Sequence, residues 1–561
     1  MSPGLRISLT RDRVLDGSAI AAIIVAVVCV YLPGVYGFWG RDDFMQLAFS
    51  RLVGSPWPAF VHDHFPVPGS VFRPLGFASM WLCAMVFGAD YEANAIADLA
   101  LHAGVSVVLL VILFRAGIPR WIACLCTLVF ALHPATIGTA LWWSARFDLL
   151  STLFVALSLR WAFDYRDRQR PAALACALLA ALAAMLSKEI GLTAVVALSL
   201  LWLRWAWTDP LQRVRAGRAL VLIWLVAALY LGWRASVLGT AASGLAGAGP
   251  LHRLLFKGVM DWLVQAPGYW SFWPRLGVTR QIMLVVALGM LAAGFIASFV
   301  SSTARRMAIF NVDLAMAGLV LFLLPALLQA PIAAQNGAPI SAGVSAIETA
   351  MQSRLYYLGI AGAALVLAAV LAVAVRNAGT GARVAVLVGL GLLVITEASI
   401  SHRSARAFAK RSVAISAVAR DAVAAVEALD LPATHCHVIF LDVDPAPEWS
   451  VYVSMDSVVK ALSPDLQRVR RCYFHSNYIS YFHLQGNPVD RADIAPYGPM
   501  QVGGVDIPWR RIGDLTIAYL QAPAESDVEP LAGMTFLRYR GNVFEDVTAD
   551  VLADCIAVRL Q

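Results

Sequence analysis

Two adjacent carboxylates, Asp42 and Asp43, follow the first apolar segment of the chain by a few residues. Carboxylates at a membrane surface are costly to desolvate, so such a pair is either a solvated loop start or a functional site. A positioned carboxylate can accept the proton of a hydroxyl group while that group attacks. The pair is therefore a candidate general base, with an ordinary loop start as the alternative.

Four basic residues lie beside the ends of apolar segments, namely Arg73, Arg146, Lys188 and Arg354. Fixed positive charge can stabilise the negative charge that develops on a leaving phosphate. The alternative is local ion pairing, with Arg146 bound to Asp148 and Lys188 bound to Glu189. The residue types allow both interpretations.

The composition indicates a chain that lipid must partly cover. Of the 561 residues, 60% are hydrophobic and 14% are charged, whereas soluble domains carry about 25% charged residues. The net charge of +7 comes from basic residues that gather in short loops. Such loops are typical topology signals, so we expect the bilayer as a partner and no nucleic acid.

Apolar runs of near-spanning length predict an α-helical polytopic membrane protein with about eleven transmembrane helices. The predicted spans are residues 18–36, 94–114, 119–134, 144–163, 171–187, 190–207, 218–237, 281–300, 308–328, 355–375 and 382–400.

Charge decides whether the ambiguous segment 71–88 also crosses the membrane. Leaving it out places the arginine-rich short loops on the side of the N-terminus, as the positive-inside rule requires. We therefore expect a cytoplasmic N-terminus, an external C-terminal part, and long outer loops at 37–93, 238–280 and 329–354. The four basic residues then lie on the outer side, against the usual trend, so an anion should compensate them.

The composition changes after Ser399, which predicts two domains, a membrane domain at 1–402 and a soluble external domain at 403–561. The second domain is predicted to be a small α+β domain, because a helix-like stretch at 405–429 precedes short strand-like runs. Its two cysteines, Cys436 and Cys472, can pair in an oxidising compartment. Further elements are predicted as strands at 435–443, 478–484, 515–520 and 534–539 and a helix at 454–462.

Several short motifs resemble the GT-C glycosyltransferase superfamily, and most closely its protein O-mannosyltransferase branch, including the membrane part of the tetratricopeptide-containing enzymes. The matching stretches follow Asp42-Asp43 in the family's order over about 320 residues, which makes the set far more specific than any one motif. They are Phe72-Arg73-Pro74-Leu75, Asp98-Leu99-Ala100-Leu101-His102, Phe130-Ala131-Leu132-His133-Pro134, Trp142-Trp143-Ser144-Ala145-Arg146-Phe147-Asp148-Leu149-Leu150, Leu186-Ser187-Lys188-Glu189 and Arg354-Leu355-Tyr356-Tyr357-Leu358-Gly359.

Three features depart from the family pattern. Gly138 stands where a glutamate is expected, Asp98 stands where the family has Asn, and no tetratricopeptide repeats follow. These departures concern the acceptor more than the chemistry.

The resemblance implies transfer of one sugar from a polyprenyl-phosphate donor to a hydroxyl acceptor on the outer face, with inversion of the anomeric centre. Asp42 matches the base position, and Asp43 would orient the base or the acceptor. The donor phosphate would lie against Arg146, Lys188, Arg354 and Arg73. The substrate-binding candidates are His102, His133, Asp148, Glu189, Tyr356 and Tyr357.

The scheme requires no cofactor, and we expect no divalent metal. The acceptor can be a protein Ser or Thr, or an envelope glycan or lipid. A bacterial inner membrane is the expected location. A transporter or flippase of lipid-linked sugars is the alternative, although it would place charges near mid-span rather than at span ends.

Overall fold

The computed structural model of the protein is mostly helical. It describes residues 3–40, 42–62, 71–239, 277–301, 311–335, 353–377, 379–431, 436–441, 455–470, 472–476, 500–502, 505–507, 509–512, 515–518, 534–540 and 543–550.

The chain divides into two compact units. Unit 1 comprises Met1–Val35, Phe72–Gly76 and Ala95–Phe408, and unit 2 comprises Tyr36–Val71, Phe77–Asn94 and Ala409–Gln561. The predicted domain boundary after residue 402 falls inside the long helix α18, and it stays a prediction.

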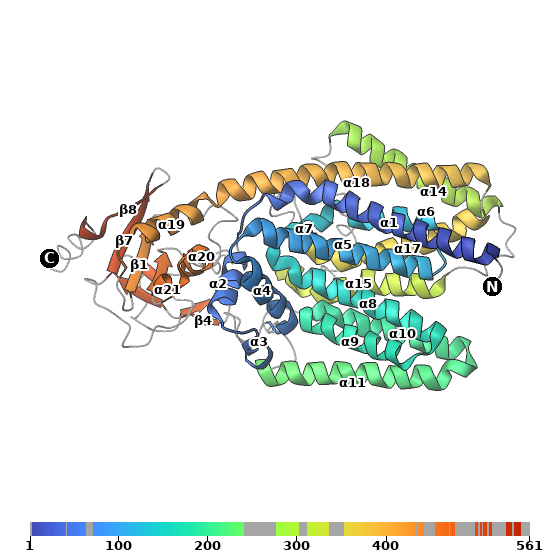
Figure 1. Cartoon of the computed structure of the whole chain (residues 1–561), viewed down its shortest axis with the longest axis horizontal. Helices are drawn as coiled ribbons and strands as arrows, with labels where there is room; N and C mark the ends of the chain where they lie inside the picture. The colour runs from blue at the N-terminus through green and yellow to red at the C-terminus, as the bar shows by residue number, and fades with distance from the viewer. Residues whose placement is uncertain are drawn as a thin grey trace. The chain divides into compact units, whose positions relative to one another are not determined.

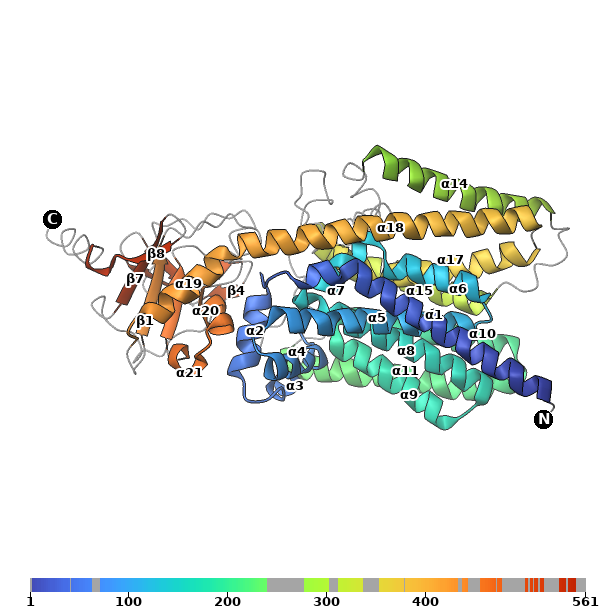
Figure 2. The same cartoon turned by 45° about the horizontal axis from the view of Figure 1, so that its top comes forward.

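Unit 1 is a bundle of long helices that run alongside one another (Figures 1 and 2). Its described α-helices are α1 (Pro3–Val35), α5 (Tyr91–Arg115), α6 (Arg120–Ala131), α7 (Ile137–Leu141), α8 (Arg146–Arg168), α9 (Pro171–Ser187), α10 (Leu192–Thr208), α11 (Arg213–Leu238), α14 (Val278–Ser301), α15 (Val312–Gln335), α17 (Tyr357–Asn377) and α18 (Thr380–Ile415).

Short 3-10 turns precede several of these helices, and most of the candidate site residues lie in or beside them. The turns are η1 (Pro134–Thr136), η2 (Trp143–Ala145), η3 (Glu189–Gly191), η4 (Pro210–Gln212) and η7 (Arg354–Tyr356).

The apolar helices identify an integral membrane protein. Among the described residues, 7 helices are long and apolar enough to cross a bilayer, and α6 with the segment Pro134–Leu141 forms a further pair bent by 51°. The seven are Leu15–Val35, Tyr91–Arg115, Glu189–Thr208, Pro210–Leu238, Val278–Ile296, Arg354–Arg376 and Thr380–Ala428. Every span expected from the sequence overlaps a helix, but the total of eleven crossings stays a prediction.

The ambiguous segment contains one helix, α4 (Pro74–Phe87), which has 14 residues. At 1.5 Å per residue this helix is about 21 Å long, shorter than the roughly 30 Å hydrocarbon core of a bilayer. Because α9, a predicted span, has only 17 residues, helix length does not decide the matter, and the prediction that this segment does not cross the membrane stays a prediction.

Unit 2 contains a four-stranded sheet in the order β2-β1-β7-β8. Strand β1 (Cys436–Leu441) is parallel to both β2 (Cys472–Ser476) and β7 (Met534–Arg540), and β8 (Val543–Asp546) is antiparallel to β7. The side chains of Val438, Phe440 and Phe474 are buried in one apolar core with residues of α19 (Ala417–Ala428) and α20 (Met455–Leu462).

The remaining described elements of unit 2 are short. They are α2 (Asp42–Leu52), α3 (Pro58–Val61), α21 (Leu466–Val469), and the pairs β3 (Met500–Val502) with β4 (Val505–Ile507) and β5 (Trp509–Ile512) with β6 (Leu515–Ala518). The strands predicted at 435–443, 515–520 and 534–539 correspond to β1, β6 and β7, and the helix predicted at 454–462 corresponds to α20. The strand predicted at 478–484 lies outside the described residues.

Cys436 and Cys472 form a disulfide between the neighbouring strands β1 and β2. They are directly paired in the parallel register, with their Cα atoms 4.5 Å apart. The pairing that the sequence left open is therefore present in the structure.

Candidate functional site

The two carboxylates of the acidic pair differ in their surroundings. Both lie in the first turn of α2, but Asp43 is fully buried whereas Asp42 is partly exposed. The Gly40 backbone N–H donates to Asp43 Oδ2 at 3.2 Å, and the Asp43 N–H donates to the Gly40 carbonyl at 3.1 Å. These reciprocal bonds resemble a capping arrangement and stabilise the start of the helix. Asp42 is thus the more accessible carboxylate of the pair.

The backbone just before the acidic pair is held by hydrogen bonds within unit 2. Ser416 donates its hydroxyl to the Trp39 carbonyl at 2.9 Å, and the Phe38 N–H donates to Ser412 Oγ at 3.1 Å. The Trp39 indole N–H donates to the Ala89 carbonyl at 2.9 Å. The backbone that leads to Asp42 is therefore held in place by contacts with residues 412–416 and with Ala89.

The far end of α2 is held by Arg51. Its guanidinium donates to the Ala461 and Ser463 carbonyls at 2.5 and 2.9 Å, at the C-terminal end of α20. The last carbonyls of a helix lack partners in the helix and favour a cation. Because α20 packs on the sheet, this contact attaches α2 to the C-terminal part of the chain.

In unit 1, Glu189 joins two arginines. The Arg73 guanidinium donates to Glu189 Oε2 from Nε at 3.0 Å and from Nη2 at 2.9 Å. Arg234 of α11 donates to the other oxygen at 3.3 Å. Arg234 lies outside all the sequence motifs, although an arginine inside a predicted span is itself a signal of a polar site.

Lys188 lies between α9 and η3 and pairs with Asp148 of α8. Its Nζ donates to the two carboxylate oxygens at 2.6 and 2.7 Å. Burial lowers the pKa of Lys188 to about 8, against the opposing effect of Asp148 and with the help of the nearby positive charges of Arg73 and Arg354. Arg73 and Arg354 are thus both close enough to Lys188 to repel its positive charge.

Two glycines allow the backbones around Lys188 to approach one another. A Cβ on Gly191 would overlap the backbone of Ala184 in the last turns of α9, so the sharp turn between α9 and α10 requires glycine. A Cβ on Gly76 would overlap the Phe147 ring. The Arg73 guanidinium lies 5.3 Å from the centroid of that same ring, so close packing at Gly76 positions Arg73 beside the start of α8.

Arg146 and Arg354 each begin a helical segment and each contact a tryptophan. Arg146 is the first residue of α8, is fully buried, and donates from Nε to Asp98 Oδ1 at 2.6 Å. Its guanidinium lies 5.6 Å from the centroid of a Trp143 ring, and that of Arg354 lies 4.2 Å from a Trp142 ring. Both tryptophans are buried inside the protein. They therefore do not belong to the aromatic side chains that line a membrane surface.

The local ion pairs considered from the sequence are wrong in their partners. Arg146 pairs with Asp98, and Lys188 pairs with Asp148, while Glu189 pairs with arginines. Residues two apart on a helix point in different directions. The extended backbone at Lys188 (φ −164°, ψ 151°) sends its side chain away from that of Glu189.

The two histidines make hydrogen bonds within the fold. His102 Nε2 lies 2.9 Å from the Ala131 carbonyl and Nδ1 lies 2.6 Å from the Tyr357 hydroxyl. Because a carbonyl only accepts, Nε2 carries the proton and Nδ1 accepts from Tyr357. His133 Nδ1 accepts the Ala135 N–H at 3.2 Å and caps η1. Both side chains thus have partners within the fold, and their role in substrate binding stays a prediction.

The structure joins some of the predicted residues of unit 1 in one cluster. Arg73, Asp148, Lys188, Glu189 and Arg354 form one connected cluster in unit 1, to which Arg234 belongs. His102 and Tyr357 form a separate buried pair, and Tyr356 is buried beside Tyr357. Asp42 and Asp43 belong to unit 2.

Among the described residues, no group of three His, Cys, Asp or Glu side chains could hold a metal ion. The expectation that the chemistry needs no metal stays a prediction.

No protein-family model matches the chain, and no curated protein sequence matches it. Three solved structures resemble it at low identity. The arabinofuranosyltransferase AftD from Mycobacteria has a TM-score of 0.42 at 15% identity, over 82% of this chain and 31% of AftD. An oligosaccharyltransferase of Archaeoglobus fulgidus has a TM-score of 0.44 at 11% identity, over 83% of this chain and 69% of that chain.

The third is ArnT from Cupriavidus metallidurans bound to undecaprenyl phosphate. It has a TM-score of 0.33 at 11% identity, over 92% of this chain and 99% of ArnT. All three TM-scores lie below 0.5, so these similarities establish neither the fold nor the activity of this chain. The chain also spans only 31% of the length of AftD.

Proposed function

We propose that the protein is a membrane glycosyltransferase that moves one sugar from a polyprenyl-phosphate donor to a hydroxyl acceptor. The observation that carries the proposal is the cluster of Arg73, Lys188 and Arg354 in a chain with apolar, membrane-length helices. Asp148 and Glu189 offset part of this positive charge, and a bound anion would offset more of it. The phosphate of a polyprenyl-phosphate donor carries the negative charge that would complement these cations.

The cluster suits a phosphate leaving group. In the proposed reaction the bond between the anomeric carbon and the phosphate oxygen breaks, and the electron pair stays on the phosphate. Arg354 and Lys188 stabilise the charge that develops there, with Arg73 and Arg146 in support. Asp148 and Glu189 hold the cations in place, which keeps the site organised before the donor binds.

Asp42 is the proposed general base. It accepts the proton of the acceptor hydroxyl as that oxygen attacks the anomeric carbon from the face opposite the phosphate, so the centre inverts. Asp43 is proposed to position Asp42 rather than to touch the substrate. Its carboxylate accepts a hydrogen bond from the Gly40 N–H and so stabilises the first turn of α2. No metal is part of the proposal.

The acceptor and the compartment follow from the motif resemblance and the predicted topology. We propose a protein Ser or Thr, or an envelope glycan or lipid, as acceptor on the outer face of a bacterial inner membrane. The Cys436–Cys472 disulfide supports an external C-terminal domain, since disulfides persist in oxidising compartments.

The test is donor turnover in lipid nanodiscs. The full chain is incubated with a panel of polyprenyl-phosphate sugars and candidate acceptors, and released polyprenyl phosphate is measured. Wild-type protein should release the carrier with at least one donor, and Asp42→Asn should be slower by about 100-fold or more, the usual contribution of a general base.

Asp430→Asn is the matched control, because Asp430 is an exposed carboxylate of unit 2 remote in sequence from the acidic pair. It should behave as wild type. Equal rates for Asp42→Asn and wild type would remove Asp42 from the mechanism. Binding of a lipid-linked sugar without release of the carrier from any donor would instead indicate a transporter.

A further inference from the structure

The long helix α18 and the helix α19 meet at a single residue, Ser416. Its backbone has φ −88° and ψ 7°, and its N–H donates to the Ser412 carbonyl at 3.0 Å. Ser412 and Ser416 are four positions apart, so their side chains lie on the same face of the joined helices. Both residues are completely buried. This joint therefore presents two hydroxyl groups to the interior of unit 2.

The two hydroxyl groups hold a stretch of backbone that has no regular structure. Residues 37–40 belong to neither a helix nor a strand, so their buried backbone groups need other partners. The Phe38 N–H donates to Ser412 Oγ at 3.1 Å, and the Ser416 hydroxyl donates to the Trp39 carbonyl at 2.9 Å. The joint therefore supplies one acceptor and one donor to a segment 374 and 377 positions earlier in the chain.

Side chains strengthen the same attachment. The Arg420 guanidinium of α19 lies 5.0 Å from the centroid of the Phe38 ring, a distance at which a cation is attracted to the ring face. The Trp39 side chain is completely buried and contacts the Tyr91 ring edge-on, with the ring centroids 5.2 Å apart. Phe38 and Trp39 are therefore held by their side chains as well as by their backbone.

The joint is itself attached to the core of the C-terminal sheet. Ala422 and Val426 of α19 are buried in the apolar cluster to which the strands β1 and β2 also contribute. A close-packed interior transmits a displacement instead of absorbing it. The serine pair therefore has a rigid support in the sheet.

Asp42 lies three positions after Trp39, in the first turn of α2. The reciprocal hydrogen bonds between Gly40 and Asp43 fix this turn relative to the segment that the serines hold. A general base must come within about 2.6–3.2 Å of the group whose proton it accepts, and a misplacement of about 1 Å can cost about 100-fold in rate. Loss of the bond to the Trp39 carbonyl should therefore move or loosen Asp42.

We propose that Ser412 and Ser416 are positioning residues for Asp42, and that the C-terminal domain, entered at this joint, serves to hold the proposed base in place. The inference rests on the proposed function, in which Asp42 is the base. Neither serine touches the substrate in this scheme. Their effect on the rate should therefore pass entirely through Asp42, which separates positioning from a general contribution to stability.

The test is a double-variant cycle on the full chain in lipid nanodiscs, with release of polyprenyl phosphate as the readout. Ser416→Ala should lower kcat about tenfold, less than a misplacement of about 1 Å can cost. The KM for the donor should change less than about twofold, because the proposed phosphate-binding cluster lies in unit 1. In the Asp42→Asn background, Ser416→Ala should cause no further loss, since a residue that acts through Asp42 has nothing left to position.

Two further variants keep the test informative. Ser412→Ala should give the same split between kcat and KM, and Ser416→Thr keeps the hydroxyl and should recover most of the rate. Amide exchange at residues 38–40 and 42–46 should rise in both alanine variants and stay low in Ser416→Thr. If the denaturation midpoint shows that Ser416→Ala folds poorly, Ser412→Ala decides the test.

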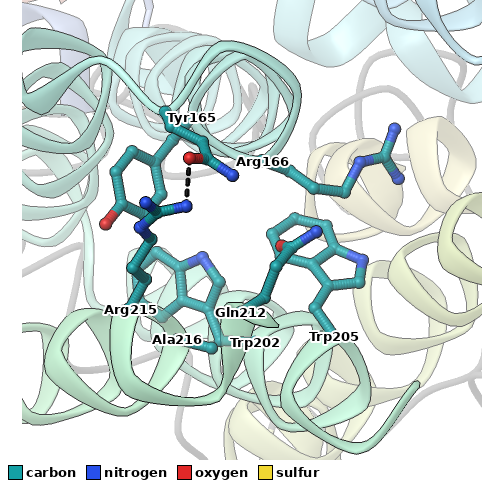
Figure 3. Close-up of a pocket in the computed structure, with 8 residues that line it drawn as sticks. Tyr165, Arg166, Trp202, Trp205, Gln212, Arg215 and Ala216 are labelled. Atoms are coloured by element: carbon teal, nitrogen blue, oxygen red, sulfur yellow. Dashed lines mark hydrogen bonds between the residues drawn. The ribbon is translucent and has the colours of Figure 1, made fainter. Parts of the chain in front are cut away.

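Two control variants remove hydrogen bonds of unit 1. Ser158→Ala removes a buried hydroxyl that donates to the Val155 carbonyl at 2.8 Å within α8. Arg215→Ala removes the side-chain bond from α11 to Gln169 at the end of α8, which is drawn as a dashed line in Figure 3. Both should leave kcat and the exchange at residues 38–40 as in wild type. An equal fall of kcat in either control would show a general effect of lost stability and overturn the proposal.

The outcomes distinguish this inference from the proposed function. If wild type releases no carrier from any donor, the proposed function is refuted and the inference falls with it. If wild type turns over donor but kcat stays unchanged in both alanine variants, only the positioning role is refuted. Losses that multiply when Asp42→Asn and Ser416→Ala are combined would likewise overturn it, because they would show that Ser416 acts independently of Asp42.

Discussion

Lys188 donates to both carboxylate oxygens of Asp148, at 2.6 and 2.7 Å, although the two residues are 40 positions apart on different segments. The pair lies beside Arg73 and Arg354, whose charges act against that of Lys188. Asp148 therefore offsets part of a positive cluster that would otherwise repel itself. A bound phosphate would do the same from the other side, which makes the charge state of Lys188 a sensitive test of the proposed donor site.

We expect donor turnover to fall as the pH rises through about 8. Below its lowered pKa of about 8, Lys188 is charged, and above it the amine is neutral and can no longer attract phosphate. The kcat/KM profile reports the free enzyme, so the decline should appear there. In Lys188→Arg the guanidinium stays charged, and kcat/KM should stay level through pH 9. If kcat/KM fell at the same pH in wild type and in Lys188→Arg, another group would be responsible for the pH dependence.

Asp43 is expected to tolerate Asn but not Ala. The bond from the Gly40 N–H needs only an acceptor oxygen, which Asn retains. Asp43→Ala loses it and should destabilise the start of α2 by about 1 kcal/mol, with a matching rise in amide exchange at residues 42–46. If Asp43→Asn loses as much turnover as Asp42→Asn, then Asp43 acts in the chemistry and not through the helix start.

Arg146 and Asp98 are expected to depend on one another for stability. Both are almost completely buried, and removing one partner of such a pair costs about 3–5 kcal/mol, because the other charge is left uncompensated. Asp98→Asn and Arg146→Gln should each lower the denaturation midpoint in detergent. The double variant should recover most of the loss, whereas additive losses would show that the two side chains do not interact.

Arg51 is expected to control the order of α2 without contacting substrate. Arg51→Ala leaves the Ala461 and Ser463 carbonyls without their donor, so amide exchange should rise in α2 and at the end of α20. Turnover should fall mainly through kcat, since Asp42 is carried by the same helix. Arg51→Lys restores a cation near the carbonyls and should recover part of both properties. Unchanged exchange in Arg51→Ala would contradict this role.

The helices and the clustered cations of unit 1 could be selected from the sequence, but the carboxylate partners of those cations could not. Each predicted span overlaps a helix, and the motif spacing alone selects Arg73, Lys188 and Arg354. Carboxylate pairing depends on which helices pack together. Asp98 appeared only as a departure from the family pattern, yet it is the partner of Arg146, and no local spacing indicates a contact between residues 48 positions apart.

Arg234 is a second residue whose partner could not be predicted from the sequence. It lies near the end of the strongly apolar helix α11 and outside every sequence motif. Its contact with Glu189 appears only when α9, η3 and α11 are packed. A rule that treats every charged residue inside an apolar segment as a site candidate would have found it.

The disulfide between β1 and β2 has a consequence for the covalent topology of the domain. Cys436 and Cys472 are 36 positions apart, so the chain between them is a closed ring that contains α20 and α21. A protease that cuts once inside this ring leaves the two products joined, and they separate on a gel only after reduction. The Ala461 and Ser463 carbonyls that accept from Arg51 belong to the same ring. After a single cut, the segments before and after α20 therefore stay covalently connected through the disulfide.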